Sequence, residues 1–208
     1  MKSLTHYIQE KLIIKKSTTK KNKSTNYKYF PKSKYELKNI IFKRIKDEGN
    51  EVDLNDIDVS KINDMSSLFE NLKDFNGNIS RWDVSHVTDM RYMFCECKSF
   101  NKDISAWNVS NVNNMYGMFG ACEAFNQDIS EWDVSKVKNM GEMFSYCQSF
   151  NQDISAWDVS NVIKMEAMFY WCKNFNQDIS SWDVSNVKYM DYMFHSCQIE
   201  EKYKPKFK

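Results

Sequence analysis

Hydrophobic positions recur along most of the chain with a period of 25 residues. One copy begins at Phe125 and reads FNQDISEWDVSKVKNMGEMFSYC. A fixed period in this range indicates a stack of structural repeats, and it takes precedence over local secondary-structure signals. Three apolar columns are expected in the core of this stack: Trp82, Trp107, Trp132, Trp157 and Trp182; Met90, Met115, Met140, Met165 and Met190; and Cys97, Cys122, Cys147, Cys172 and Cys197.

The apolar spacing changes in the middle of each copy. Trp132 and Val134 are two residues apart, which predicts a short strand with its polar residues facing the other way. The following apolar residues have the spacing of one helical face: Val137, Met140, Met143, Phe144 and Cys147. Each repeat is therefore expected to hold one short parallel strand and one helix of about ten residues. The predicted fold is an α/β solenoid of the leucine-rich-repeat type with an N-terminal helical cap.

The repeat can be written Fxx[DN]IS-x-W-[DN]-VS-x-V-xx-M-xx-MF-xx-C, and this motif extends over residues 34–199. It resembles the repeat of BspA-like leucine-rich repeat surface proteins, also described as mycoplasma-lipoprotein-type repeats of unknown function. The resemblance implies a leucine-rich-repeat fold and a role in adhesion or protein binding, since many members are surface proteins. Related repeats occur in viruses and phages, which adds a phage or viral protein as an alternative.

The pattern also sets the boundaries along the chain. Ser33 and Glu36 form a capping box that starts a helix, and Gly49 supplies its stop. The predicted parts are an amphipathic segment with a basic tether at 1–30, a capping helix at 31–49, a degenerate first repeat at 50–74, five repeats at 75–199 and a polar tail at 200–208.

Charge and composition place the protein in a broad class. The chain has 208 residues and a net charge of +1, so no overall field favours nucleic acid. It contains no apolar run long enough to span a membrane and no secretory signal. We therefore expect a cytoplasmic or particle-associated protein, with the cell surface left open through another export route. The basic tether reads as a solvated linker, and contact with an acidic partner, nucleic acid or anionic lipid is its alternative reading.

Nothing in the pattern indicates catalysis. The three histidines are dispersed, and no phosphate-binding loop or nucleophile–base pair is present. The methionines read as gap-filling core residues, and the cysteine column reads as buried, reduced thiols, with Cys95 outside it. The sequence thus predicts a monomeric, non-enzymatic protein without cofactor or metal.

Binding candidates come from three sets of residues. Stacked Asp and Asn columns can cap loops through Asx turns, face a partner, or bind calcium, and the column starting at Asn76 is expected to form a ladder. Variable and aromatic positions suit an interface. The candidate partner-binding residues are Arg81, Asp83, Asp133, Asp158, Asp183, Tyr92, Tyr116, Tyr146, Tyr170, Trp171 and Tyr192.

Three functional hypotheses follow from this pattern. The first is a scaffold that binds another protein through its sheet face or its aromatic helix face. The second is a structural or packaged component addressed by its N-terminal segment. The third and weakest is binding of nucleic acid through the basic tether.

Overall fold

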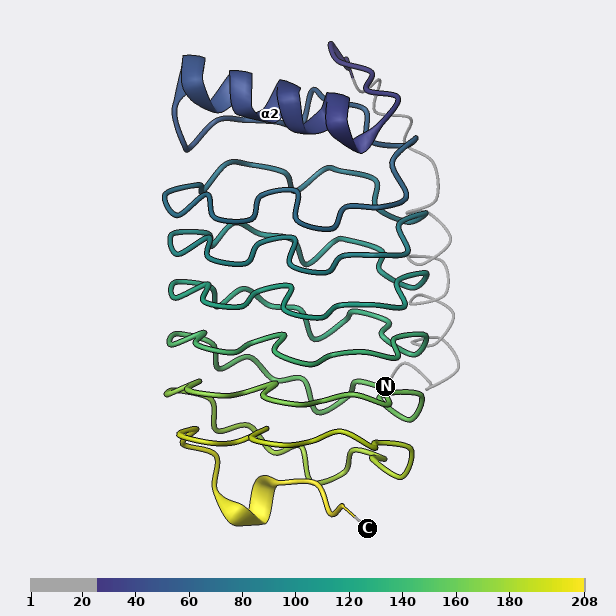
Figure 1. Ribbon diagram of the computed structural model, residues 1–208, viewed down its shortest axis with the longest axis vertical. Coiled ribbons are helices and arrows are strands. Elements are labelled where there is room, and N and C mark those ends of the chain that lie inside the picture. Colours follow the sequence, from purple (N-terminus) through teal and green to yellow (C-terminus); the bar gives the residue numbers. More distant parts are fainter. Residues whose placement is uncertain (1–25, 208) are drawn as a thin grey trace, which may run out of the picture.

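The computed structural model describes residues 26–207, which form a stack of 25-residue coils. Helix α2 (Lys34–Glu48) lies at one end of the stack, and the short 3-10 helix η1 (Glu201–Tyr203) lies at the other (Figure 1). Neighbouring coils are joined by single-residue parallel bridges, such as Asp89 with Asn114. The period of the sequence is therefore the period of the stack. The predicted amphipathic segment and nearly all of the basic tether fall outside the described residues.

Helix α2 starts where local capping favours it. The Ser33 hydroxyl accepts a hydrogen bond from the Glu36 N–H at 3.2 Å, and the Glu36 carboxylate accepts one from the Lys32 N–H at 2.8 Å. Gly49 ends the helix with a φ of 89°, a conformation that glycine adopts without a side-chain penalty. Leu37 and Ile41 are fully buried, so α2 covers the apolar end of the first coil.

The predicted strand and helix in each repeat are both wrong, and with them the leucine-rich-repeat-like α/β solenoid. Within residues 26–207 the only long helix is α2, and the parallel pairing is limited to isolated bridges. At the expected strand, the Trp132 N–H bonds back to Ile129 O at 3.2 Å and the Val137 N–H bonds to Val134 O at 2.9 Å. These bonds close two successive turns, so the chain here has no ladder of backbone bonds to the next coil.

The expected helix is replaced by a run of turns, residues 140–147 and their equivalents, which we call the turn segments. The Met143 N–H bonds to Met140 O three residues back, whereas the Glu142 N–H bonds to Glu166 O in the next coil. An α-helix needs every N–H for the carbonyl four residues back, so this division of the donors excludes it. Two residues of every turn segment also have positive φ: Ser67 and Asn71, Tyr92 and Glu96, Gly117 and Ala121, Glu142 and Tyr146, Ala167 and Trp171, and Tyr192 and Ser196. A right-handed helix cannot contain them.

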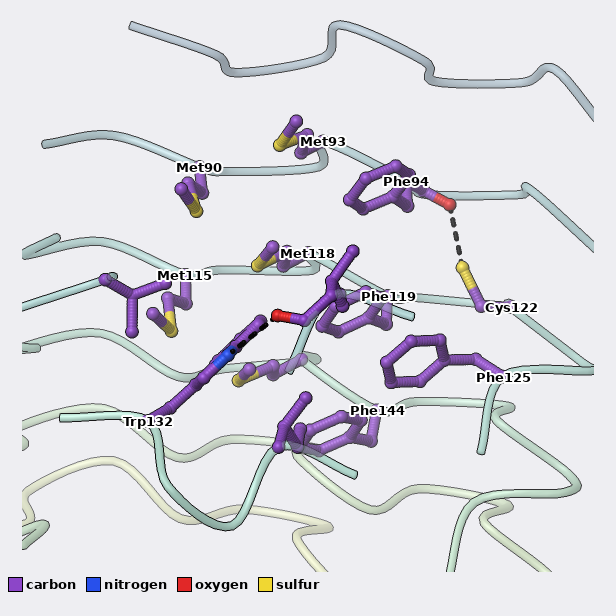
Figure 2. Packing of buried hydrophobic residues seen from close by; sticks show 14 of the residues in the cluster. Met90, Met93, Phe94, Met115, Met118, Phe119, Cys122, Phe125, Trp132 and Phe144 are labelled. Carbon is purple, nitrogen blue, oxygen red and sulfur yellow. Dashed lines mark hydrogen bonds between the residues drawn. The ribbon is translucent and has the colours of Figure 1, made fainter. Parts of the chain in front are cut away.

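The core is a stack of side chains that repeats in the same register as the backbone. Phe94 and Phe119 stack with ring centroids 5.6 Å apart, and Phe119 lies 4.1 Å from Phe125 in a second phenylalanine column (Figure 2). The indole N–H of Trp132 donates to Ile104 O in the preceding coil at 3.3 Å. Such bonds satisfy the one polar group of each buried indole.

The last coil departs from the expected core. Met190 is 40% exposed and Cys197 is only half-buried, although both belong to columns expected in the core. The other members of the three columns are buried. The difference arises because, within the described residues, no further coil packs on this side of Met190, and residues 198–207 cover only part of this end.

Candidate functional site

The turn segments place two kinds of side chain on opposite sides of the backbone. Met140, Met143 and Phe144 point into the core and are fully buried. Glu142 and Tyr146, the residues with positive φ, keep contact with solvent. Because the coils are stacked in register, the outward residues of successive turn segments form one continuous side of the molecule.

Aromatic residues gather on this side in what we call the aromatic strip, formed by Tyr92, Tyr116, Tyr146, Tyr170, Trp171, Tyr192 and His195. Six of these seven were candidates from the sequence, and three of the six, Tyr170, Trp171 and Tyr192, lie in the last two coils together with His195. The 25-residue period orders these residues along the stack but does not predict which rings touch.

The rings of the aromatic strip contact one another between coils. Tyr146 meets Tyr170 edge-on at 5.3 Å and stacks on Trp171 at 6.3 Å. His195 stacks on Tyr170 at 5.2 Å and meets Tyr192 edge-on at 6.0 Å. The structure therefore joins four of the candidate aromatics into one group and brings in His195, which sequence reasoning missed.

The second aromatic group is Tyr92 with Tyr116, whose centroids are 5.1 Å apart. The Tyr116 hydroxyl donates a hydrogen bond to the Glu142 carboxylate. Burial raises the pKa of Tyr116, and the neighbouring Glu142 carboxylate raises it further. This hydroxyl therefore stays protonated and acts as a donor at neutral pH.

A shallow hollow of about 340 Å³ opens on the aromatic strip, lined by Glu142, Ser145, Tyr146, Ala167, Tyr170 and Tyr192. Burial, followed by its hydrogen bond with Tyr170, raises the pKa of Tyr146. The hollow thus offers uncharged phenols, aromatic ring faces and the carboxylate of Glu142. Glu142 stands at one of the positions that vary between repeats, which the sequence marked as suited to an interface, whereas Ser145 was not singled out.

Two glycines make room for this arrangement. A Cβ on Gly117 would lie 2.7 Å from the ring of Tyr92, and a Cβ on Gly141 would lie 2.8 Å from Cδ of Glu166. Side chains at these two positions would displace the neighbouring ring or carboxylate. The signal was present in the sequence, since glycine stands at the corresponding positions in no other repeat.

A family model described as "Mycoplasma protein of unknown function, DUF285" matches residues 36–146 and 122–204. The chain belongs to this family. The two matches overlap and together extend from α2 to the C-terminal residues. They show the mycoplasma repeat family that the motif resembled, whereas the relation to BspA-like surface proteins, and to phage or viral proteins, stays a prediction. No curated protein and no solved structure matches the chain.

The acidic columns of this DUF285 chain hold its turns. Asp133 Oδ1 accepts hydrogen bonds from the Ser135 N–H at 3.1 Å and from its hydroxyl at 2.6 Å. Asp83 and Asp158 bond Ser85 and Ser160 in the same way, and the Ser185 N–H donates to Asp183 at 3.0 Å. The bonds from serine lower the pKa of Asp133. This geometry is that of Asx turns, in which the carboxylate replaces a backbone acceptor.

The column that starts at Asn76 is a ladder between coils. Asn101 Oδ1 accepts the Asn126 N–H at 3.0 Å, and Asn126 Oδ1 accepts the Asn151 N–H at 2.9 Å. Arg81 is exposed, and its backbone N–H donates to Asn55 Oδ1 at 2.7 Å. Arg81 and the acidic columns belong to the Trp-bearing half of each coil, whereas the aromatic strip belongs to the turn segments.

The cysteines also serve the stack. The Cys122 thiol donates to Phe94 O at 2.8 Å, and burial raises its pKa strongly. Burial raises the pKa of Cys95 to about 11, so its thiol is protonated at neutral pH as well. Among residues 26–207 there is no group of three or more His, Cys, Asp or Glu side chains placed to hold a metal ion. Over the same range, no helix has the length and apolar character that crossing a membrane requires.

Proposed function

We propose that this protein is a non-enzymatic repeat scaffold that binds another protein through its aromatic strip. The observation that carries the proposal is the exposure of large apolar side chains around the hollow. Tyr146 is 45% exposed, Trp171 is 38% exposed and Tyr192 is 71% exposed. Exposed aromatic residues that already contact one another lose little conformational freedom on binding and are typical of interface hot spots.

The acidic columns support a structural role more than a partner-binding one. The carboxylates of Asp83, Asp133 and Asp158 each bond both the N–H and the hydroxyl of a serine in their own coil. A partner that bound them would have to compete with these bonds. The phenol and indole rings of the aromatic strip have no such internal task at their exposed faces.

The hollow also favours one partner chemistry. Glu142 lines the hollow together with Tyr146, Tyr170 and Tyr192. Cationic side chains bind well where aromatic faces and a carboxylate meet. We therefore propose that the partner inserts an arginine or lysine side chain here.

A pair of variants tests the proposal against a matched control. The double change Tyr146→Ala and Trp171→Ala removes two rings of the aromatic strip, whereas Tyr35→Ala removes a ring that is 76% exposed on α2. With partners captured from cells and quantified against wild type, we expect the double variant to lose at least about tenfold in binding, since two hot-spot rings contribute more than about 1 kcal/mol each. The control should bind as wild type does. Equal binding by the double variant, or an equal loss in the control, would contradict the proposal.

A further inference from the structure

The hydrogen bonds between turn segments all run in one direction. In each of the five interfaces, four N–H groups donate to carbonyls of the next coil at 2.7–3.0 Å. Met140, Glu142, Phe144 and Tyr146 are the donors in one coil, and their equivalents donate in every other interface. The intervening N–H groups bond within their own coil. Each turn segment therefore presents carbonyls toward the N-terminal end of the stack and N–H groups toward the C-terminal end.

The last coil consequently ends in a row of donors. The N–H groups of Met190, Tyr192, Phe194 and Ser196 occupy the donor positions, and no described residue accepts a hydrogen bond from them. Backbone donors without an acceptor are rare where water is excluded, so the end of a ladder is a ready template for another chain.

The C-terminal residues cover only one part of this end. The Ile179 N–H donates to Tyr203 O at 3.0 Å, and Lys204 Nζ lies 5.5 Å from the centroid of Phe194. Tyr189 remains 51% exposed and Met190 remains 40% exposed beside the row of donors. The uncovered part thus combines free backbone donors with apolar side chains.

We infer that a polypeptide segment of a partner protein docks on this end and continues the stack. Its backbone carbonyls would accept the N–H groups of Met190, Tyr192 and Phe194, as the carbonyls of the last coil accept those of Met165, Ala167 and Phe169. Its apolar side chains would cover Met190 and Tyr189. This is strand addition in which the partner supplies acceptors to the turn segment.

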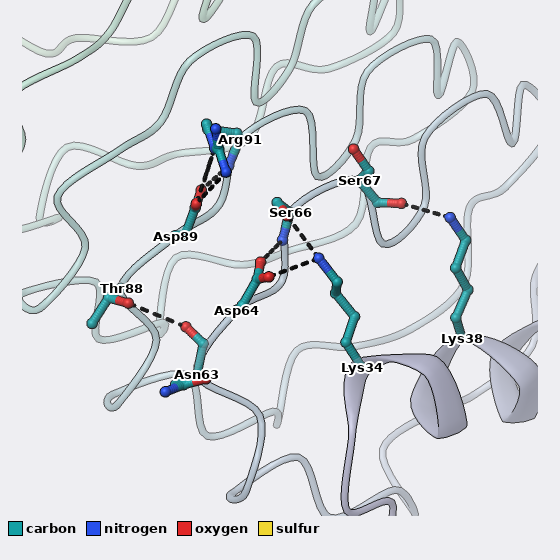
Figure 3. Close-up of polar contacts among 9 residues, drawn as sticks. All are labelled: Lys34, Lys38, Asn63, Asp64, Ser66, Ser67, Thr88, Asp89 and Arg91. Carbon is teal, nitrogen blue, oxygen red and sulfur yellow. Dashed lines mark hydrogen bonds and ion pairs between the residues drawn. The ribbon is translucent and has the colours of Figure 1, made fainter.

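The direction of the bonds in the turn segments argues against a second copy docked end to end as the occupant. Two C-terminal ends would oppose donors to donors. The opposite end, which presents carbonyls, is covered by α2 in the same chain. There Lys34 Nζ contacts Asp64 Oδ2 and Ser66 Oγ at 2.8 Å each, and Lys38 Nζ donates to Ser67 O at 3.0 Å (Figure 3). The occupant that we infer is therefore a partner chain with an uncovered row of carbonyls.

Amide hydrogen exchange of the full chain tests the first part of the inference. The amides of Met190, Tyr192, Phe194 and Ser196 should exchange at least about 100-fold faster than the bonded amides of the preceding coil, because protection reports the opening of hydrogen bonds. The bonded set for comparison is Met165, Ala167, Phe169 and Trp171. Equal protection of the two sets would show that this end is already occupied, and would overturn the inference.

A peptide probe tests the second part. A synthetic peptide of residues 187–198 carries the row of carbonyls that the preceding coil already binds, and a peptide of residues 177–186 from the Trp-bearing half is the control. At about 1 mM the first peptide should slow exchange of the four terminal amides by about tenfold, roughly the effect of one net hydrogen bond per amide. The control peptide should leave them unchanged.

Two outcomes would overturn the docking site. One is no slowing by the first peptide at that concentration, and the other is equal slowing by both peptides. Met190→Asp, which removes apolar contact and adds a charge, should weaken the effect, with exchange in the other coils verifying that the variant is folded. Rings of the aromatic strip can be truncated without changing these backbone donors, so the proposal for that strip and this one can fail separately.

Discussion

The two ends of the stack are closed in different ways. At the N-terminal end α2 buries Leu37 and Ile41 completely, and two lysines bond to the first coil. At the C-terminal end η1 and the residues after it bury Pro205 but leave Met190 exposed. Backbone carbonyls can accept hydrogen bonds from long cationic side chains of a helix, as Ser67 O does from Lys38. A row of backbone N–H groups instead requires acceptors at backbone spacing. The first end is thus closed by a helix of the same chain, whereas the second keeps the uncovered donors on which the proposed docking site rests.

The largest expected effect on the free energy of unfolding comes from truncating a buried isoleucine, and its size should differ between the two ends. Ile41→Ala should lower the free energy of unfolding by about 3 kcal/mol, because it leaves a cavity between α2 and the first coil. Ile199→Ala, at a side chain that is 6% exposed, should cost less, since the partly open end can relax into the space. Urea denaturation measures both. A larger cost at Ile199 would reverse the comparison.

The next effect concerns the ion pair that fixes α2. Arg44 Nη1 bonds Asp56 Oδ1 at 2.8 Å, and Nη2 donates to Asp53 O at 3.0 Å. Arg44→Met should cost about 2 kcal/mol, because it leaves a largely buried carboxylate without its main partner. Arg44→Lys keeps the charge but loses the forked geometry of the guanidinium. Its melting temperature should therefore lie between those of the wild type and Arg44→Met. No change in either variant would mean that burial of Leu37 and Ile41 alone holds the helix.

A smaller effect should separate the lysines at the two ends. Lys38→Met removes the bond to Ser67 O and should cost about 1 kcal/mol. Lys204→Met removes a contact with the ring of Phe194 and an exposed pair with Glu201, and should cost less than about 0.5 kcal/mol. Chemical denaturation of the two variants side by side resolves the difference. Equal costs would show that lysine capping is not special to the carbonyl end.

The smallest effect per group is the response to acid. Burial alone would raise the pKa of Asp56, but Arg44 and Lys28 outweigh it and lower the pKa. A carboxylate with a lowered pKa stabilises the fold above its unfolded pKa, about 3.9, and the contribution is lost as the pH falls through the folded value. The melting temperature should therefore be flat from about pH 7 to 5 and fall below about pH 4. Asp56→Asn should reduce this fall in melting temperature. An unchanged pH dependence would mean that other carboxylates, such as those of the Asx turns, cause the loss of stability in acid.

Much of the core could be predicted from the sequence, but the path of the backbone could not. The spacing of Val137, Met140, Met143 and Phe144 shows which side chains point inward, and these residues are buried. The same inward spacing arises from a helix or from successive turns closed by bonds three residues back. What decides between them is the bonding of N–H groups such as that of Glu142 to the next coil, a contact 24 residues away that no local pattern contains.

The aromatic strip was predictable in its members and not in its grouping. Tyr146, Tyr170, Trp171 and Tyr192 stood outside the core columns and were selected for that reason. In the structure Tyr146, Trp171 and Tyr192 all have positive φ. Residues other than glycine rarely adopt this conformation, so sequence propensity argues against it.

The Asn ladder has a consequence for how such a chain can change over generations. Asn126 Oδ1 accepts a hydrogen bond from the Asn151 N–H, and Asn151 Oδ1 accepts one from the Asn176 N–H. Successive coils are therefore joined by the same bond. Duplication or loss of one 25-residue unit in the gene would join two equivalent surfaces and leave both ends of the protein as they were. The length of the stack can thus change in whole units, while α2 and the final row of donors are inherited unchanged.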